Sequence, residues 1–173
     1  MRGRQTAIVI VLDEAPQLEP VRAEFHPDAV AMGIPLHVTL LVPFVPPDEV
    51  DEAELEEFFT QFDGFTLTLT GLATWPGVVY AVPEPRDQLL AIMHALFEKY
   101  PDFPPYECQI AEPEPHATLT ELEPRESLEE VLDGIRARTE SLFPLTCGIR
   151  DVALLEEYEP DRWRERRRFP LRT

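Results

Sequence analysis

The chain has 173 residues, of which 44% are hydrophobic and 28% charged, and this composition is typical of one compact soluble domain. Its formal net charge of −18 at pH 7 argues against binding to long nucleic acid, which requires lysine and arginine to neutralise many phosphates. The longest early apolar run, residues 7–12, is too short for a signal sequence or a membrane span. We therefore expect a cytoplasmic protein with no membrane partner.

The first elements of the chain are predicted to be a strand, a helical segment and a second strand. Residues 6–12 are apolar and β-branched, which is typical of a buried strand. Residues 17–32 contain helix-like stretches, which Gly33 and Pro35 end. Residues 36–42 then predict the second strand.

A helix and two strands follow in the first half. The helix is predicted to begin at Pro47, with acidic residues in its first turn. Residues 65–70 alternate strictly between apolar residues and threonine, as in a half-buried strand, and residues 78–82 predict another strand. The apolar face of the helix comprises Leu55, Phe58, Phe59 and Phe62.

The second half is predicted to contain a similar set of elements. A helix begins near Pro85, and a proline-rich connection follows it, in which only residues 106–110 have the pattern of a short strand. Residues 116–122 predict a further strand. Ser127 and Glu130 have the spacing of a capping box at the start of another helix.

Two strands are predicted to close the chain, over residues 142–155 and 162–171. Because each half contains strands, a helix and one strand with the same short motif, we interpret the chain as a diverged duplication. Residues 1–173 are then a single domain of two intertwined lobes.

Charge is concentrated in two segments. Residues 48–57 contain seven acids, which is typical of a solvated helix face. Residues 162–168 contain five arginines, for which two interpretations remain open. These arginines either pair with the acidic face or attract phosphate.

The most informative feature is a repeated four-residue motif. Residues 37–40 read His-Val-Thr-Leu and residues 116–119 read His-Ala-Thr-Leu. If composition alone governed the order of residues, two His-x-Thr-Leu matches would arise by chance about 4 times in 10,000. One copy carries little information, but the pair is significant.

Strand geometry gives this motif a chemical purpose. Successive side chains of a strand point to opposite faces, so His37 and Thr39 share one face, and His116 and Thr118 do the same. Two imidazoles in one cleft can act on a phosphodiester, because one can accept a proton and the other donate one near neutral pH. The threonine hydroxyls can donate hydrogen bonds to the non-bridging oxygens.

This chemistry needs no cofactor and no metal. No third ligand stands at a recognisable spacing that would make a zinc site of His37 and His116. The remaining histidines, His26 and His94, are interpreted as structural or surface residues.

Several segments together resemble a known family. They are the paired motif, Pro43-Phe44 after its first copy, the strand Val78-Val79-Tyr80, and the endings Val152-Ala153-Leu154-Leu155 and Phe169-Pro170-Leu171. They resemble the two-histidine (2H) phosphoesterase superfamily, and within it the bacterial 2′-5′ RNA ligase-like proteins.

The resemblance implies a bilobal α+β fold, with pseudo-twofold lobes, antiparallel sheets around a central cleft and helices on the outside. It also implies cofactor-free action on cyclic phosphates or 2′-5′ linkages. His37 and His116 would be the acid–base pair, with Thr39 and Thr118 as phosphate binders. Phe44 is a candidate for stacking on a base at the rim of the cleft, although a core position is an equal alternative.

The sequence departs from many relatives after the second motif, where they have a basic residue and this chain has Thr120-Glu121-Leu122. We therefore expect hydrolysis of a 2′,3′-cyclic nucleotide or another small phosphodiester. We also expect the protein to be a monomer. The alternatives are a non-catalytic module that binds a nucleotide or phosphorylated metabolite, and a 2′-5′ RNA ligase. As a hypothesis, Glu114 or Glu121 stabilises protonated His116, which makes His116 the acid and His37 the base.

Overall fold

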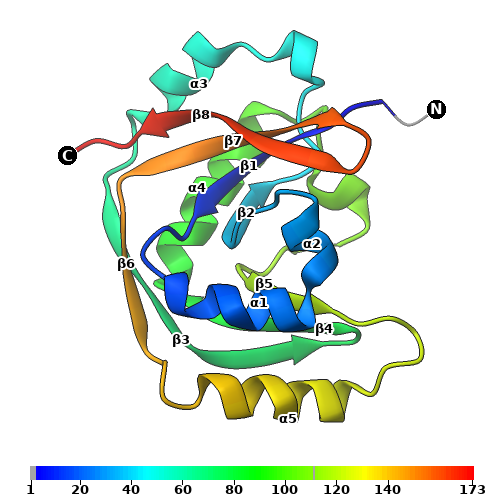
Figure 1. Cartoon of the computed structure of the whole chain (residues 1–173). Coiled ribbons are helices and arrows are strands. Elements are labelled where there is room, and N and C mark those ends of the chain that lie inside the picture. Colours follow the sequence, from blue (N-terminus) through cyan, green and yellow to red (C-terminus); the bar gives the residue numbers. More distant parts are fainter. Residues whose placement is uncertain (1–2, 111) are drawn as a thin grey trace.

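A computed structural model of the chain describes residues 3–110 and 112–173. These residues form two four-stranded antiparallel sheets flanked by helices, which confirms the predicted bilobal α+β class (Figure 1). The strands are β1 (Thr6–Val11), β2 (His37–Leu41), β3 (Phe65–Trp75), β4 (Val78–Glu84), β5 (Ala117–Glu121), β6 (Leu145–Ile149), β7 (Asp151–Glu159) and β8 (Arg162–Pro170). The α-helices are α1 (Glu19–Phe25), α2 (Pro27–Ala31), α3 (Glu52–Phe59), α4 (Arg86–Lys99) and α5 (Leu128–Thr139).

The two sheets draw on different parts of the chain. The first sheet has the order β2-β1-β7-β8 and joins the two ends of the chain, whereas the second has the order β5-β4-β3-β6 and uses its middle (Figure 1). The strand at or beside each motif, β2 or β5, is an edge strand of its sheet. These two edge strands lie close to each other, so the motifs meet where the sheets approach.

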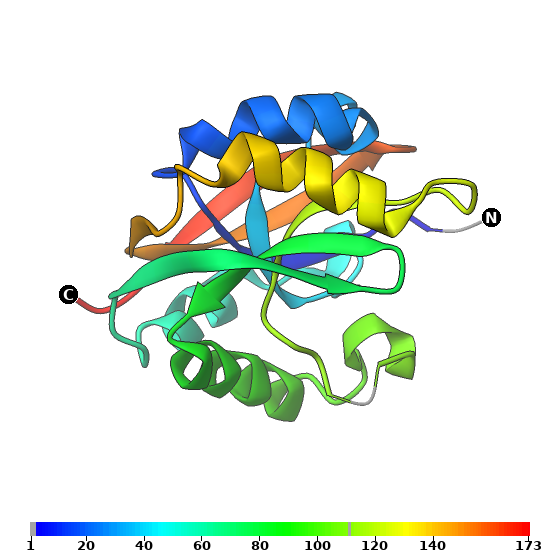
Figure 2. The same ribbon diagram turned by 90° about the horizontal axis from the view of Figure 1, so that it is seen from below.

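The helices cover the outside of this arrangement. Figure 2 shows α1, α2 and α5 on one side of the sheets and α3 and α4 on the other. Helix α1 contacts both α5 and β5, while α4 contacts β2. No helix within the described ranges is both long and apolar enough to cross a membrane.

The helix predicted from Pro47 begins later than the sequence pattern indicated. Residues Pro47–Glu49 form one 3-10 turn, and α3 starts only at Glu52. The reason is the cap: the Asp51 carboxylate accepts a hydrogen bond from the Glu54 amide at 3.0 Å. At α5 the predicted cap is confirmed, because the Ser127 hydroxyl accepts from the Glu130 amide at 3.4 Å.

The prediction of one strand over residues 142–155 was wrong. The segment contains two strands in different sheets, β6 paired with β3 and β7 paired with β1 and β8. The change occurs at Arg150, whose carbonyl accepts a hydrogen bond from the Leu171 amide at 2.8 Å. An apolar pattern does not reveal this change, because strand-like residues stand on both sides of Arg150 and only one residue separates the two strands.

The prediction of a short strand at residues 106–110 was also wrong. Pro105–Cys108 is a 3-10 turn in which Tyr106, Glu107 and Cys108 have φ of 50°, 52° and 64°. A strand requires negative φ, so this left-handed turn excludes one. The Tyr106 amide instead donates to the Val42 carbonyl at 2.7 Å, which fastens the turn beside the end of β2.

The five arginines of residues 162–168 all pair with acids. Arg166 binds Glu52 at 2.6 Å and Glu156 at 3.3 Å, and Arg167 binds Glu52 at 3.1 Å. Of the two interpretations of this segment, the structure favours pairing with acidic residues, which include those of α3. This network holds α3 against β8, and none of the five arginines lines the cavity described below.

Candidate active site

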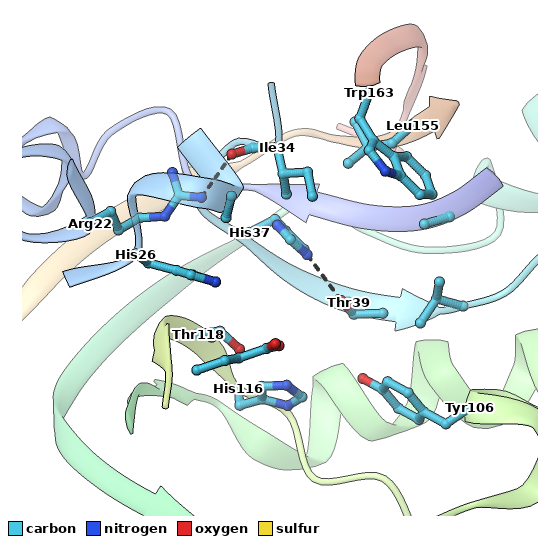
Figure 3. A pocket seen from close by; sticks show the side chains of 14 residues that line it. Arg22, His26, Ile34, His37, Thr39, Tyr106, His116, Thr118, Leu155 and Trp163 are labelled. Atoms are coloured by element: carbon cyan, nitrogen blue, oxygen red, sulfur yellow. Dashed lines mark hydrogen bonds between the residues drawn. The ribbon is translucent and has the colours of Figure 1, made fainter. Parts of the chain in front are cut away.

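A cavity of about 250 Å³ lies between the two sheets, and all four motif side chains line it (Figure 3). His37 and Thr39 come from β2, while Thr118 comes from β5 and His116 from the residue before it. The residues between them point into the core: Val38, Leu40, Ala117 and Leu119 are each at most 1% exposed. The alternation predicted from strand geometry is therefore confirmed.

The His37 ring is held at both nitrogens. Its Nδ1 lies 2.7 Å from the Pro35 carbonyl oxygen, and its Nε2 lies 3.1 Å from Thr39 Oγ1. Because a carbonyl only accepts, Nδ1 carries the proton of the neutral ring. Nε2 is then an acceptor, to which the Thr39 hydroxyl donates.

The His116 ring is held by one hydrogen bond at Nδ1 and by two aromatic rings. Its Nδ1 lies 2.7 Å from the carbonyl oxygen of Glu114, again two residues earlier in the chain. Trp75 and Tyr80 contact the ring edge-to-face, with centroid distances of 4.5 Å and 5.7 Å. Because a carbonyl only accepts, Nδ1 carries the proton of the neutral ring and Nε2 is left as an acceptor.

The electrostatic environments of the two imidazoles differ. Burial lowers the pKa of His37 to about 4, and the positive charge of Arg22 adds to this effect. Burial also lowers the pKa of His116, but the hydrogen bond to Glu114 and the negative charges of Glu121 and Glu114 oppose the shift. His37 therefore lies near the positive charge of Arg22, and His116 lies near the negative charges of Glu121 and Glu114. The hypothesis that Glu114 or Glu121 stabilises protonated His116 requires such negative charges.

One end of the cavity contains three charged or titratable residues. The sequence did not predict that these three residues come together. They are Arg22 in the middle of α1, His26 between α1 and α2, and Glu121 at the end of β5. Arg22 carried no sequence signal, because its position in the cavity depends on how α1 packs against β5. His26, interpreted as a structural or surface residue, lines the cavity.

The other end of the cavity is apolar and aromatic. Tyr106 approaches from the left-handed turn, and Trp163 approaches from β8 together with Leu155 of β7 (Figure 3). Trp163 is placed by a close contact: its amide donates to the Met32 carbonyl at 2.7 Å, and its own carbonyl lies 2.5 Å from where a side chain on Gly33 would begin. Glycine is required at that position, where φ is +81°.

The structure corrects the candidate stacking role of Phe44 and supports the alternative, a core position. This side chain is only 4% exposed and contacts Tyr100 and Phe103 edge-to-face, at centroid distances of 4.9 Å and 6.0 Å. It does not line the cavity, so it is a core residue and not a platform for a base. The physical reason is that the ring gains more by burial against two other rings than a single exposed stacking face would give.

Within residues 3–110 and 112–173, no three His, Cys, Asp or Glu side chains are grouped so as to hold a metal ion.

Comparisons with known proteins identify a family and a shared fold. The family model of the 2′-5′ RNA ligase superfamily matches residues 11–161. The protein TT0787 of Thermus thermophilus aligns with a TM-score of 0.66 at 20% identity over 98% of each chain. A protein described as a phosphoesterase aligns at 0.63 with 19% identity, over 99% of this chain and all of the other.

A third similar structure is E. coli LigT complexed with ATP, with a TM-score of 0.61 at 19% identity over 99% of this chain and 100% of that one. LigT has also been solved with 3′-AMP and with NADP+. At these identities the likeness concerns the fold. No curated protein matches the chain.

Proposed function

The chain belongs to the 2′-5′ RNA ligase superfamily, and we propose that it is a phosphodiesterase that opens a 2′,3′-cyclic nucleotide or another small phosphodiester. The observation that supports this proposal is the matched pair of imidazoles in one cavity. His37 and His116 each donate from Nδ1 to the carbonyl two residues earlier, and each presents Nε2 to the same space. The two rings can therefore act on opposite sides of one phosphorus atom.

In the proposed reaction, neutral His37 accepts a proton from water through Nε2 as the water oxygen attacks phosphorus. The P–O bond to one ribose oxygen breaks, and protonated His116 donates its Nε2 proton to that oxygen. The products are a ribose hydroxyl and a phosphate monoester. The positive charge of Arg22 beside His37 and the negative charge of Glu121 beside His116 favour this division of roles.

The two threonines are proposed to stabilise the charge that develops on phosphate. Both Thr39 and Thr118 line the cavity next to the imidazoles. The Thr39 hydroxyl donates to His37 Nε2 in the free protein, and it can rotate to donate to a non-bridging oxygen when substrate is bound. Such donors stabilise the transition state when they are aimed at the developing charge in a partly buried site.

The size and charge of the cavity support a small substrate. A volume of about 250 Å³ lies just below the usual range of ligand pockets, which favours a small ligand and is far too small for a folded RNA. The arginines of β8 are paired with acids, and the net charge is −18. The ATP, 3′-AMP and NADP+ bound by LigT, which shares the fold, are also small nucleotides.

Turnover of 2′,3′-cyclic AMP and 2′,3′-cyclic UMP by the wild-type protein in EDTA tests the proposal. We expect the nucleoside monophosphate as product, detected by ³¹P NMR or chromatography. Tight binding without product would instead favour a binding module. Joining of RNA ends, with an affinity that falls steeply with salt, would favour a ligase.

The pH dependence of kcat/KM tests the division between acid and base. For 2′,3′-cyclic UMP, whose base does not titrate in this range, we expect an acidic limb near pH 4 as His37 becomes protonated. The alkaline limb lies below 6.5, because His116 must keep its proton and its pKa is lowered.

Glu121→Gln is expected to move only the alkaline limb, and to move it to lower pH, because the negative charge of Glu121 raises the pKa of His116. Glu129→Gln, which removes a charge from the exposed first turn of α5, is the matched control and should leave both limbs in place. Movement of the acidic limb in Glu121→Gln would contradict this assignment, because that limb would then belong to His116 and not to His37.

A further inference from the structure

Arg22 is an unusual residue of this cavity. Among the described residues that line the cavity it is the only lysine or arginine, and it is 3% exposed. Figure 3 shows its guanidinium beside Ile34 and His37, above His26. A guanidinium stays charged at all relevant pH values, so it is the one permanent positive charge in the cavity wall as the described residues form it.

The hydrogen bonds of the Arg22 guanidinium leave its Nε–H donor without a partner among the described residues. Nη1 lies 3.2 Å from the Glu19 carboxylate, and Nη2 donates to the Ile34 carbonyl at 2.7 Å. The buried Nε–H has no hydrogen-bond partner among the described residues. An unsatisfied buried donor costs about 1–3 kcal/mol, and more when the group is charged, so it requires an explanation.

The two existing bonds fix where this donor stands. Ile34, which binds Arg22, directly precedes Pro35, whose carbonyl binds His37 Nδ1. The guanidinium and the imidazole are therefore anchored to consecutive carbonyls of one segment. Any shift of this segment moves both groups together, which keeps Arg22 in register with His37.

The Glu19 carboxylate does not fully neutralise the positive charge of the Arg22 guanidinium. The Glu19 side chain is 49% exposed, so water screens its contact with the deeply buried Arg22. The second motif offers no cation either, since Glu121 stands at the end of β5 and lines the same cavity. A negatively charged ligand beside Arg22 would supply both the missing acceptor and the missing charge.

We propose that Arg22 is a phosphate-binding residue: Nε is closed off from solvent in the free protein, and a small shift of the guanidinium lets Nε–H donate to a non-bridging oxygen of the phosphate that lies between His37 and His116. This inference rests on the proposed function. It means that a cation from α1 supplies the positive charge that the second motif lacks. Charge-assisted bonds of this kind are stronger than neutral ones, and the rigid guanidinium plane favours phosphate.

Calorimetric binding of 3′-AMP and of adenosine tests the role of Arg22. In Arg22→Met we expect the affinity for 3′-AMP to fall by about tenfold to a hundredfold, because one charge-assisted hydrogen bond is lost. The affinity for adenosine, which has no phosphate, should not change. Arg22→Lys keeps the charge but lacks Nε–H, so its affinity for 3′-AMP should lie between those of Arg22→Met and the wild type.

Arg138→Met is the matched control. Arg138 is exposed, pairs with Glu24 of α1 at 3.0 Å and does not line the cavity. The Arg138→Met substitution removes one positive charge from the same side of the molecule as Arg22→Met. It should leave the affinities for 3′-AMP and adenosine unchanged. Equal losses of affinity for 3′-AMP in Arg22→Met and Arg138→Met would show that only the overall electrostatic field of the protein affects binding. That result would overturn the inference.

A measurement on the wild-type protein avoids any dependence on how well the variants fold. The Nε–H signal of Arg22 in a ¹H–¹⁵N spectrum, assigned by its loss in Arg22→Lys or by through-bond experiments, should shift on titration with 3′-AMP and stay in place with adenosine. If it does not shift with 3′-AMP, or if 3′-AMP does not bind, the inference is wrong. Failure of the proposed function appears separately, as absence of cyclic nucleotide turnover in a protein whose Arg22 signal still responds to 3′-AMP.

Discussion

Replacing His37 or His116 with alanine is expected to lower kcat/KM for a 2′,3′-cyclic nucleotide by about 10²–10⁴-fold, the usual contribution of a positioned general acid or base. Both rings are fixed at Nδ1 by a carbonyl 2.7 Å away, so neither the other ring nor water can take over the lost proton transfer at the same geometry. Initial rates over a range of substrate concentrations, measured with EDTA present, give the change directly.

The double variant should be little worse than either single one. A reaction that needs both transfers in one transition state loses most of its acceleration with the first, so the effects are not additive. His94→Ala is the control, because His94 is exposed on α4 and outside the cavity. Circular dichroism of each variant checks the fold. Full activity in either single cavity variant would contradict the proposed mechanism.

Phe44→Ala is expected to lower the free energy of unfolding by about 3–5 kcal/mol, as is typical when a buried phenylalanine is truncated. The ring is 4% exposed and touches Tyr100 and Phe103, so its removal leaves a void between β2, α4 and the turn that follows α4. Urea denaturation followed by fluorescence or circular dichroism measures the loss.

Phe44→Leu is the companion variant, because it keeps an apolar side chain in place and loses less volume. We expect a smaller loss of stability than in Phe44→Ala and an unchanged KM for the cyclic nucleotide, since Phe44 does not line the cavity. A raised KM with stability unchanged in Phe44→Leu would mean that the ring does contact the base, as its place after the first motif had indicated.

The motif side chains were predictable from sequence because their geometry is local. In a strand the alternation of faces is fixed by the backbone, so His37 with Thr39 and His116 with Thr118 must share a face wherever the strand lies. The same locality explains why the strand of residues 6–11 and the Ser127 cap of α5 were found. The capping box spans only three residues, and its signal does not depend on tertiary contacts.

Other features depended on contacts that a linear pattern does not record. Residues on both sides of Arg150 read as one strand, yet they pair with different sheets. The turn at Pro105–Cys108 adopts left-handed φ where its amide bonds to the end of β2. Phe44 follows the motif in sequence but is buried under α4.

The repeated His-x-Thr-Leu motif was therefore determined by the sequence itself, together with the acid–base chemistry of its side chains. The surroundings of that motif were decided only by the tertiary structure. Arg22 in the wall of the cavity and Trp75 against the His116 ring come from other segments of the chain, and packing alone brings them to these places. The pKa of an imidazole depends on burial and on charges within a few ångströms, so the difference between the two histidines exists only once the chain has folded.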